Sequence, residues 1–305
     1  MTETCEILLK HFQIRKTKTQ KTAFLHWAAE EGRKAGYTVT IQKSLLGSRN
    51  LIFGDPAAAK VVFTAHYDTC TRLFFPNFIT PKSRFCYLLW QGVLSLLILM
   101  AAVPPVLAWV YLELPFAAWS LSIVLWGMVF LMLFGPANRH TANDNTSGVA
   151  TVLESMAQMP ENLRKDAAFV LFDLEEAGLL GSFFFSRKYK STLRHTLLLN
   201  FDCVSDGDHL LFCLKKRAEL WLPALESAFA NVSGKRVELC QKGYIYPSDQ
   251  MHFPCGVGAA ALRQGPFGLL YLSRIHTRRD TVFQPENIAL LSRGAVRLTG
   301  ILAKN

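Results

Sequence analysis

Paired cysteines are the first feature that the sequence lacks. The chain has seven cysteines, an odd number, and no two of them form a Cys-x-x-Cys pair. This count and spacing argue against a disulfide framework and against a cysteine-type zinc site. The stretch Met1–Glu6 also lacks a basic segment followed by an apolar one, so we expect no secretory signal peptide. Both absences favour a reducing compartment.

Charge is nearly absent from one long stretch, since Glu113 is the only charged residue between Phe85 and Asn138. A helix that spans a bilayer needs about 20 predominantly apolar residues. Two runs meet that requirement, at about 85–111 and 116–134. We therefore expect residues 85–135 to form an inserted transmembrane helical hairpin. The alternative is a pair of buried helices in a large soluble core, but core helices normally keep a polar stripe, which these runs lack.

Blocks of Lys and Arg with interleaved aromatic residues are also missing, so we expect no nucleic-acid partner. The net charge of +10 fits an anionic membrane surface better. Basic residues lie near the two ends of the expected hairpin and an acidic one lies in its turn: Arg72, Lys82, Arg84, Arg139 and Glu113. The positive-inside rule then predicts an integral membrane protein, in contact with the lipid bilayer, whose remaining chain lies in the cytoplasm.

Outside the hairpin, short apolar strands alternate with helical patterns. The expected strands are Val61–Ala65, Ala168–Leu174, Thr196–Phe201, Leu210–Leu214 and Ala259–Leu262, and the expected later helices are Thr146–Met159, Leu179–Tyr189, Arg217–Asn231 and Glu286–Leu302. This alternation predicts an α/β fold with a largely parallel sheet and helices on both faces. Residues 1–84 and 136–305 would form one discontinuous domain.

Potential metal ligands follow several of these strands. His66 comes directly after the first strand, Glu175-Glu176 after the second and Asp202 after the third. The carboxyl ends of strands in open α/β sheets are where catalytic residues gather. Histidine and carboxylate donors without cysteine suit an open, catalytic zinc site better than a structural one.

Each of these residues also has an ordinary interpretation. A single histidine is more often a surface or core residue, Asp144 is a plausible helix cap, and Glu175-Glu176 could form an exposed acidic pair. For Glu175-Glu176 and for Asp202, the ordinary interpretation as exposed carboxylates fits the neighbouring residues poorly. The glutamates follow an apolar strand, and Asp202 is flanked by Phe201 and Cys203. Such carboxylates are expected to be partly buried and to need a partner.

In combination, the motifs resemble the M28 family of zinc exopeptidases. They are His66-x-Asp68 after a strand, Asn-Asp-Asn-x-Ser-Gly-Val-Ala from 143, Glu-Glu-x-Gly-Leu-x-Gly-Ser from 175, Asp202 after the next strand, and His-Thr-x-x-Asp-Thr from 276. The resemblance covers roughly residues 15–80 and 138–303. It implies a three-layer α/β/α sandwich with a mixed, largely parallel central sheet, the aminopeptidase-like fold.

The resemblance also implies a role for each motif residue. Two zinc ions are expected, one held by His66 and Asp202 and the other by Glu176 and His276, with Asp144 bridging them. Glu175 would be the general base of peptide-bond hydrolysis. Asp68 would be a second catalytic carboxylate, which orients His66.

The chain departs from the family pattern at a few positions. Ser248-Asp249-Gln250 stands where the family often has Ser-Asp-His, so Gln250 is given no catalytic role. Ile275 stands where some members have a tyrosine that stabilises an oxyanion, and Tyr244 and Tyr246 are the candidate substitutes. Asp249 either recognises a substrate amine or serves as an Asx turn or cap.

The leading hypothesis is therefore a membrane-anchored di-zinc exopeptidase that acts on peptides, in the first place an aminopeptidase. One alternative is a glutaminyl-cyclase-like acyl transferase with one zinc ion. The other is a non-catalytic membrane interaction protein on the same fold, which would normally have lost ligands. The sequence leaves open the substrate, the oligomeric state and whether the hairpin forms a wall of the substrate pocket.

Overall fold

The computed structural model describes residues 1–73, 77–229 and 234–304. Its centre is one mixed sheet with the strand order β1-β2-β4-β3-β5-β8-β6-β7, and β9 pairs with β8. The strands are β1 (Val39–Lys43), β2 (Arg49–Phe53), β3 (Val61–His66), β4 (Ala167–Phe172), β5 (Leu197–Phe201), β6 (His209–Leu214), β7 (Arg236–Cys240), β8 (Gly256–Gln264) and β9 (Leu270–Tyr271). The four central strands β4, β3, β5 and β8 run parallel, as the sequence predicted.

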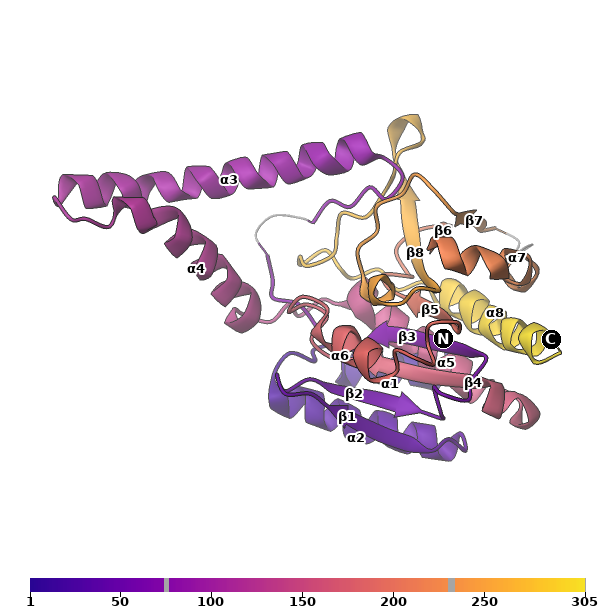
Figure 1. Ribbon diagram of the computed structural model, residues 1–305. Helices are drawn as coiled ribbons and strands as arrows, with labels where there is room; N and C mark the ends of the chain where they lie inside the picture. The colour runs from indigo at the N-terminus through magenta and orange to yellow at the C-terminus, as the bar shows by residue number, and fades with distance from the viewer. Residues whose placement is uncertain (74–76, 230–233, 305) are drawn as a thin grey trace.

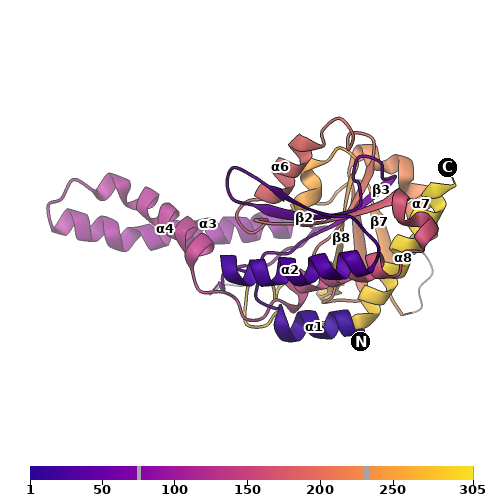
Figure 2. The same ribbon diagram turned by 90° about the horizontal axis from the view of Figure 1, so that it is seen from below.

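Helices cover both faces of this sheet, which gives the expected α/β/α layers (Figures 1 and 2). The helices of the layers are α1 (Glu3–His11), α2 (Lys18–Lys34), α5 (Gly148–Ala157), α6 (Leu180–Lys188), α7 (Leu222–Phe229) and α8 (Pro285–Ala303). Residues of α1, α2, α5, α7 and α8 share one hydrophobic cluster, and Phe185 of α6 belongs to the cluster on the opposite face. Because the sheet is packed with helices on both faces, the ends of its strands are rigid and hold the loops that follow them in place.

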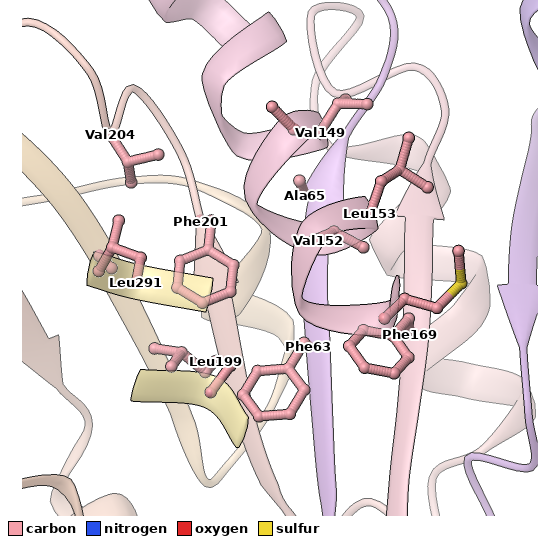
Figure 3. Close-up of a cluster of buried hydrophobic side chains, with 14 of the residues drawn as sticks. Phe63, Ala65, Val149, Val152, Leu153, Phe169, Leu199, Phe201, Val204 and Leu291 are labelled. Carbon is pink, nitrogen blue, oxygen red and sulfur yellow. The ribbon is translucent and has the colours of Figure 1, made fainter. Parts of the chain in front are cut away.

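Strand β3 shows how the sequence creates the two cores. All six of its residues are buried, and its side chains alternate between the faces, as the period of two in a strand requires. Phe63 packs on the α5 and α8 side, with its ring stacked against those of Phe169 and Phe201 (Figure 3). Val62 packs in the cluster on the other side. Full burial on both faces explains why this strand is a continuous apolar run.

Two long apolar helices extend away from one side of the layered domain (Figure 1). Helix α3 spans Arg84–Tyr111, and α4 spans Ser120–Phe134 after a short 3₁₀ turn at Ala117–Trp119. The stretches Arg84–Tyr111 and Ala117–Phe134 are long and apolar enough to cross a membrane, and only 6% of the most apolar window of each is buried. The structure therefore does not support the alternative of two buried core helices.

The ends of these two helices join the domain beside the segment that carries His276. The N–H of Leu73 donates to the carbonyl of His276 at 2.8 Å. Farther along, Ile79 and Leu272 exchange two backbone hydrogen bonds of 3.0 and 2.9 Å. At the end of α4, the Thr71 hydroxyl donates to the Met132 carbonyl at 2.8 Å. Leu73 and Ile79 thus bond to the segment 272–276, and Thr71 contacts the end of α4.

Some boundaries differ from the sequence prediction. The edge strand β7 was not predicted, because four of its five residues are exposed or half-buried and give no apolar run. The predicted helix Arg217–Asn231 begins as a 3₁₀ segment at Lys216–Trp221 and continues as α7 to Phe229. The last two residues of that prediction lie outside the described residues.

Candidate metal centre

Three of the predicted donors lie at the carboxyl edge of the parallel strands. His66 is the last residue of β3 and lies opposite Phe172, the last residue of β4. Glu175-Glu176 follows β4, and Asp202 follows β5. Because parallel strands end at the same edge, the topology alone brings these donors together.

Asp144 reaches the same edge from the loop before α5. A Cβ on Gly148 would lie 2.2 Å from the carbonyl oxygen of Phe201, so only glycine permits this close approach of α5 to the end of β5. Asn145 ties the two segments further, since its Nδ2 donates to that same carbonyl at 3.0 Å. The loop before the helix is thereby held against the end of the β5 strand, beside Asp202.

The carboxylate of Asp144 lies between two imidazoles. Its Oδ1 is 3.3 Å from Nε2 of His66, and its Oδ2 is 2.9 Å from Nε2 of His276. Asp202 Oδ1 lies 3.5 Å from His66 Nε2, and Glu176 Oε2 lies 3.3 Å from His276 Nε2. The two halves of Asp144 thus face two donor pairs, His66 with Asp202 and His276 with Glu176.

The backbone carbonyl of Asp68 sets the orientation of His66. Nδ1 of His66 lies 3.1 Å from that carbonyl, and because a carbonyl only accepts, Nδ1 carries the proton. Nε2, the other ring nitrogen, faces Asp144 and Asp202. The Asp68 carboxylate is more distant from Nδ1, at 3.6 Å. Sequence reasoning assigned the orienting role to this carboxylate, and in the structure the main-chain carbonyl of the same residue makes the closer contact with Nδ1.

The Asp68 carboxylate instead holds the turn that carries the two glutamates. It accepts the N–H of Glu175 at 3.0 Å and the N–H of Glu176 at 3.2 Å. Leu174, just before them, has a positive φ of 57°, an unusual conformation for a leucine. The two backbone hydrogen bonds stabilise this conformation and fix where the glutamate side chains begin.

Buried carboxylates outnumber cations at this edge, and the pKa values reflect the imbalance. Burial, together with the charge of Asp144, raises the pKa of Glu176 to about 8 despite the opposing effect of His276. Burial also raises the pKa of Glu175 well above its ordinary value, which His66 partly offsets. Burial alone would lower the pKa of His276, but the charges of Glu176 and Asp144 raise it to about 9. The arrangement is one that a bound cation would stabilise.

The donor atoms fit such a cation. His66, Asp144 and Asp202 form one group with ligand atoms within 4.8 Å of one another, and Glu176 and His276 belong to another group of that kind. Oε1 of Glu176 is buried and has no hydrogen-bond partner among the described residues. Nitrogen and carboxylate donors are those that zinc takes in catalytic sites. The residues present therefore suit zinc.

Asp249 also lies near these donors, but it makes no cap contact. Its side chain is fully buried, and both carboxylate oxygens lack a hydrogen-bond partner among the described residues. The Asx-turn or cap interpretation is therefore not what the structure shows. Burial raises the pKa of Asp249 to about 7, although the charge of His66 opposes the shift.

The two candidate tyrosines donate to backbone carbonyls. The Tyr246 hydroxyl donates to the carbonyl of Asp202 at 2.9 Å, and the Tyr244 hydroxyl donates to the carbonyl of Leu214 at 2.5 Å. Neither hydroxyl proton is free to meet a substrate in this structure. Gln250 is buried and donates to the Tyr246 carbonyl at 2.8 Å, a structural contact.

Sequence reasoning missed three residues that position the donors. Asp280 accepts the N–H groups of Asn143 and Asp144, and Ser248 donates to Oδ2 of Asp202 at 2.6 Å. Both belong to motifs that were noted but not interpreted. Arg15 is fully buried, and it donates through Nε to the Tyr67 carbonyl at 2.5 Å and through Nη1 to the Thr146 hydroxyl at 3.2 Å. No sequence signal distinguishes this arginine from the other basic residues.

Comparisons with known structures support the fold. The LapA aminopeptidase of Legionella pneumophila superposes with a TM-score of 0.59 at 14% identity, covering 99% of this chain and 68% of its own. A glutaminyl cyclase of Porphyromonas gingivalis reaches 0.58 at 16% identity, covering 99% and 96%. A Zn-dependent exopeptidase of Parabacteroides distasonis reaches 0.56 at 13% identity, again covering 99% and 96%. At such low identities, these similarities show a common fold.

Comparison of the sequence itself identifies a family. No curated protein matches the chain. The model of peptidase family M28 matches residues 127–298, which include Asp144, both glutamates, Asp202 and His276. That range covers more than half of the 305 residues. The chain therefore belongs to peptidase family M28, a family of zinc-dependent hydrolases.

Proposed function

We propose that this protein is a membrane-anchored di-zinc exopeptidase. One observation carries the proposal, namely that the two oxygens of Asp144 face the Nε2 atoms of two different histidines, His66 at 3.3 Å and His276 at 2.9 Å. A carboxylate with one donor pair on each side is the arrangement that a bridging ligand between two ions requires. His66 and Asp202 would hold one zinc ion, and Glu176 and His276 the other.

The chemistry of hydrolysis then falls to named residues. Bound zinc would supply the Lewis acidity that activates water and polarises the substrate carbonyl. Glu175 accepts the proton of the attacking water and delivers it to the leaving amine. The carboxylate of Glu175 lies in one cluster with His66 and Glu176, so it is beside the expected zinc donors. Asp68 holds the backbone N–H of Glu175 and thereby positions this base.

The proposed substrate is a peptide with a free amino terminus. The buried and unpartnered carboxyl of Asp249 is the group proposed to recognise that amine, because an ammonium would satisfy its oxygens. The test is a panel of aminoacyl substrates and N-blocked dipeptides, assayed with zinc and with a chelator. We expect hydrolysis of the aminoacyl substrates that the chelator abolishes. Cleavage of N-blocked substrates alone would refute the aminopeptidase assignment.

A glutaminyl-cyclase-like transferase is the second candidate, because one of the similar structures is a glutaminyl cyclase. That alternative uses one zinc ion, whereas two donor pairs face Asp144 here. Metal analysis of the purified protein distinguishes the two. About two zinc ions per chain support the peptidase, and one ion with cyclisation of amino-terminal glutamine supports the transferase.

The proposed anchor is the pair α3 and α4. At about 1.5 Å per residue, the 28 residues of α3 extend about 42 Å, more than the hydrocarbon core of a bilayer at about 30 Å. Large apolar side chains are exposed along both helices, an extent of apolar surface that water-soluble monomers do not present. Lys16, whose Nζ donates to the Met132 carbonyl at 3.0 Å, adds a basic group at the end of α4.

We propose further that the catalytic domain faces the cytoplasm, on the basis of the positive residues at the helix ends. Asp208 is an exposed position for a reporter, and six of the seven native cysteines are buried. An Asp208→Cys variant in intact cells should resist a membrane-impermeant thiol reagent and react after lysis. Labelling of intact cells would place the domain on the outside.

A further inference from the structure

One buried thiol lies among the candidate metal donors and has no role in the proposed mechanism. Sγ of Cys70 forms a group with donor atoms of Glu176 and His276 in which all lie within 4.8 Å of one another. Cys70 is 2% exposed and follows His66 by four residues. The arrangement is therefore a three-residue cluster of a sulfur, a carboxylate and an imidazole.

The backbone around Cys70 is held by Asn138. The N–H of Asn138 donates to the carbonyl of Cys70 at 3.1 Å, and its side-chain Nδ2 donates to the carbonyl of Thr277 at 3.0 Å. Thr277 is the neighbour of His276. One asparagine thus connects the cysteine with the turn that carries the histidine, which fixes the thiol and the imidazole relative to each other.

A second observation points to a missing partner at the same place. Oε1 of Glu176 is buried without a hydrogen-bond partner among the described residues, while Oε2 lies 3.3 Å from His276 Nε2. A buried carboxylate oxygen without a partner is costly. A cation between Glu176, His276 and Cys70 would satisfy this oxygen, and the thiol could then serve as one of its ligands.

The alternative is that Cys70 only fills space as a small buried hydrophobe. Its surroundings argue against this interpretation. The thiol lies in a polar cluster with Glu176 and His276, and its single described hydrogen bond is a long contact of 3.8 Å from Asn138. A thiol that coordinates a divalent cation loses its proton and becomes a thiolate ligand.

We propose that Cys70 supplies a thiolate ligand to the metal ion held by Glu176 and His276. This inference rests on the proposed di-zinc function and goes beyond it, because it makes the two metal positions chemically different. The position of Glu176 and His276 would have four donors, counting Asp144 and Cys70. That of His66 and Asp202 would have three and keep an open place, as catalytic zinc sites do.

Metal preference follows from this difference. Thiolate ligands favour zinc and other soft ions over magnesium or manganese, whereas imidazole and carboxylate donors are less selective. The sequence argued against a cysteine-type zinc site, and this inference departs from that expectation by adding one sulfur ligand at one of the two ions. Glu175, which clusters with His66, would act beside the open position.

The test is cobalt substitution of the full-length protein in detergent, followed by absorption spectroscopy. The wild type should show visible ligand-field bands and a near-ultraviolet sulfur-to-cobalt charge-transfer band. Cys70→Ser and Cys70→Ala should lose the sulfur band and bind one of the two ions at least about tenfold more weakly. The matched control is Cys86→Ser, since Cys86 is half-buried at the start of α3. It should keep the sulfur band.

A measurement on the unsubstituted protein guards against a variant that fails to fold. X-ray absorption of the zinc-loaded wild type should show sulfur at about 2.3 Å from zinc. Two bound ions without any sulfur signal would overturn the role of Cys70 and leave the di-zinc proposal standing. A sulfur band that persists in Cys70→Ser would also overturn it. Failure of the wild type to bind cobalt or zinc would overturn both proposals.

Discussion

The carboxylate of Asp280 accepts the backbone N–H of Asp144 at 3.0 Å and that of Asn143 at 2.7 Å. The residue that faces both histidines is therefore positioned by another carboxylate, 136 residues farther along the chain. This contact joins the loop before α5 to the segment after His276. It gives the backbone of Asp144 a defined position.

Asp280→Asn should weaken metal binding about 10–100-fold, because the amide places an N–H group against a backbone N–H and loosens the loop of Asp144. Zinc affinity measured by competition with a chromophoric chelator tests this expectation. Asp166→Asn is a suitable control, since Asp166 lies at the end of a 3₁₀ segment away from the candidate donors. Equal zinc affinity in both variants would exclude a positioning role for Asp280.

Glu175→Gln should reduce kcat by about 10²–10⁴-fold or more, because glutamine cannot take the proton of the attacking water. The zinc content should stay unchanged, since Glu175 is not among the proposed ligands. Steady-state kinetics together with metal analysis provide the measurement. The matched control is Glu161→Gln, an exposed glutamate. Activity within a few-fold of the wild type would remove Glu175 from the mechanism.

Metal binding should release protons and become tighter as the pH rises. The pKa of His276 is about 9 and that of Glu176 is about 8 with no cation between them, so this pair retains at least one proton at pH 7. A ligand must lose its proton to bind zinc, so the apparent affinity increases with pH until these pKa values are passed. Calorimetric titration in buffers with different ionisation enthalpies measures the protons released. A heat independent of the buffer would contradict this prediction.

Asp249→Asn should affect substrates with a free amino terminus selectively. The substitution removes the negative charge proposed to recognise the ammonium but preserves the shape of the side chain. We expect a lower kcat/KM for aminoacyl substrates and a smaller change in zinc content. A uniform loss of zinc would instead assign Asp249 to the support of the metal donors, to which its charge is coupled through His66.

Much of the site was predictable because its donors follow apolar strands. His66 and Asp202 each end or follow a strand that is buried on both faces, and a buried central strand is a strong sequence signal. The parallel order of these strands then brings the donors to one edge. Helices α3 and α4 were equally predictable, because two long stretches without charged residues can be recognised from composition alone.

The remaining features depend on tertiary contacts that a sequence does not encode locally. Arg15 lies far from both segments that it bridges and resembles any other surface arginine in the sequence. The edge strand β7 has no apolar run, because four of its five residues are exposed or half-buried. The role of Asp68 depends on the hydrogen bonds that its carboxylate accepts from the N–H groups of Glu175 and Glu176. These bonds exist only in the folded turn after β4.

In the proposed membrane-anchored enzyme, the pairing of Ile79 with Leu272 makes bilayer thickness relevant to catalysis. An α3 of about 42 Å exceeds a hydrocarbon core of about 30 Å, so the helix must tilt or extend beyond it, and its tilt depends on the lipid. A change in tilt acts on the segment before α3, and the two Ile79–Leu272 hydrogen bonds connect that segment to the stretch that leads to His276. We therefore expect turnover to vary with acyl-chain length in reconstituted vesicles. Turnover that is the same in thin and thick bilayers would show that the hairpin only tethers the domain.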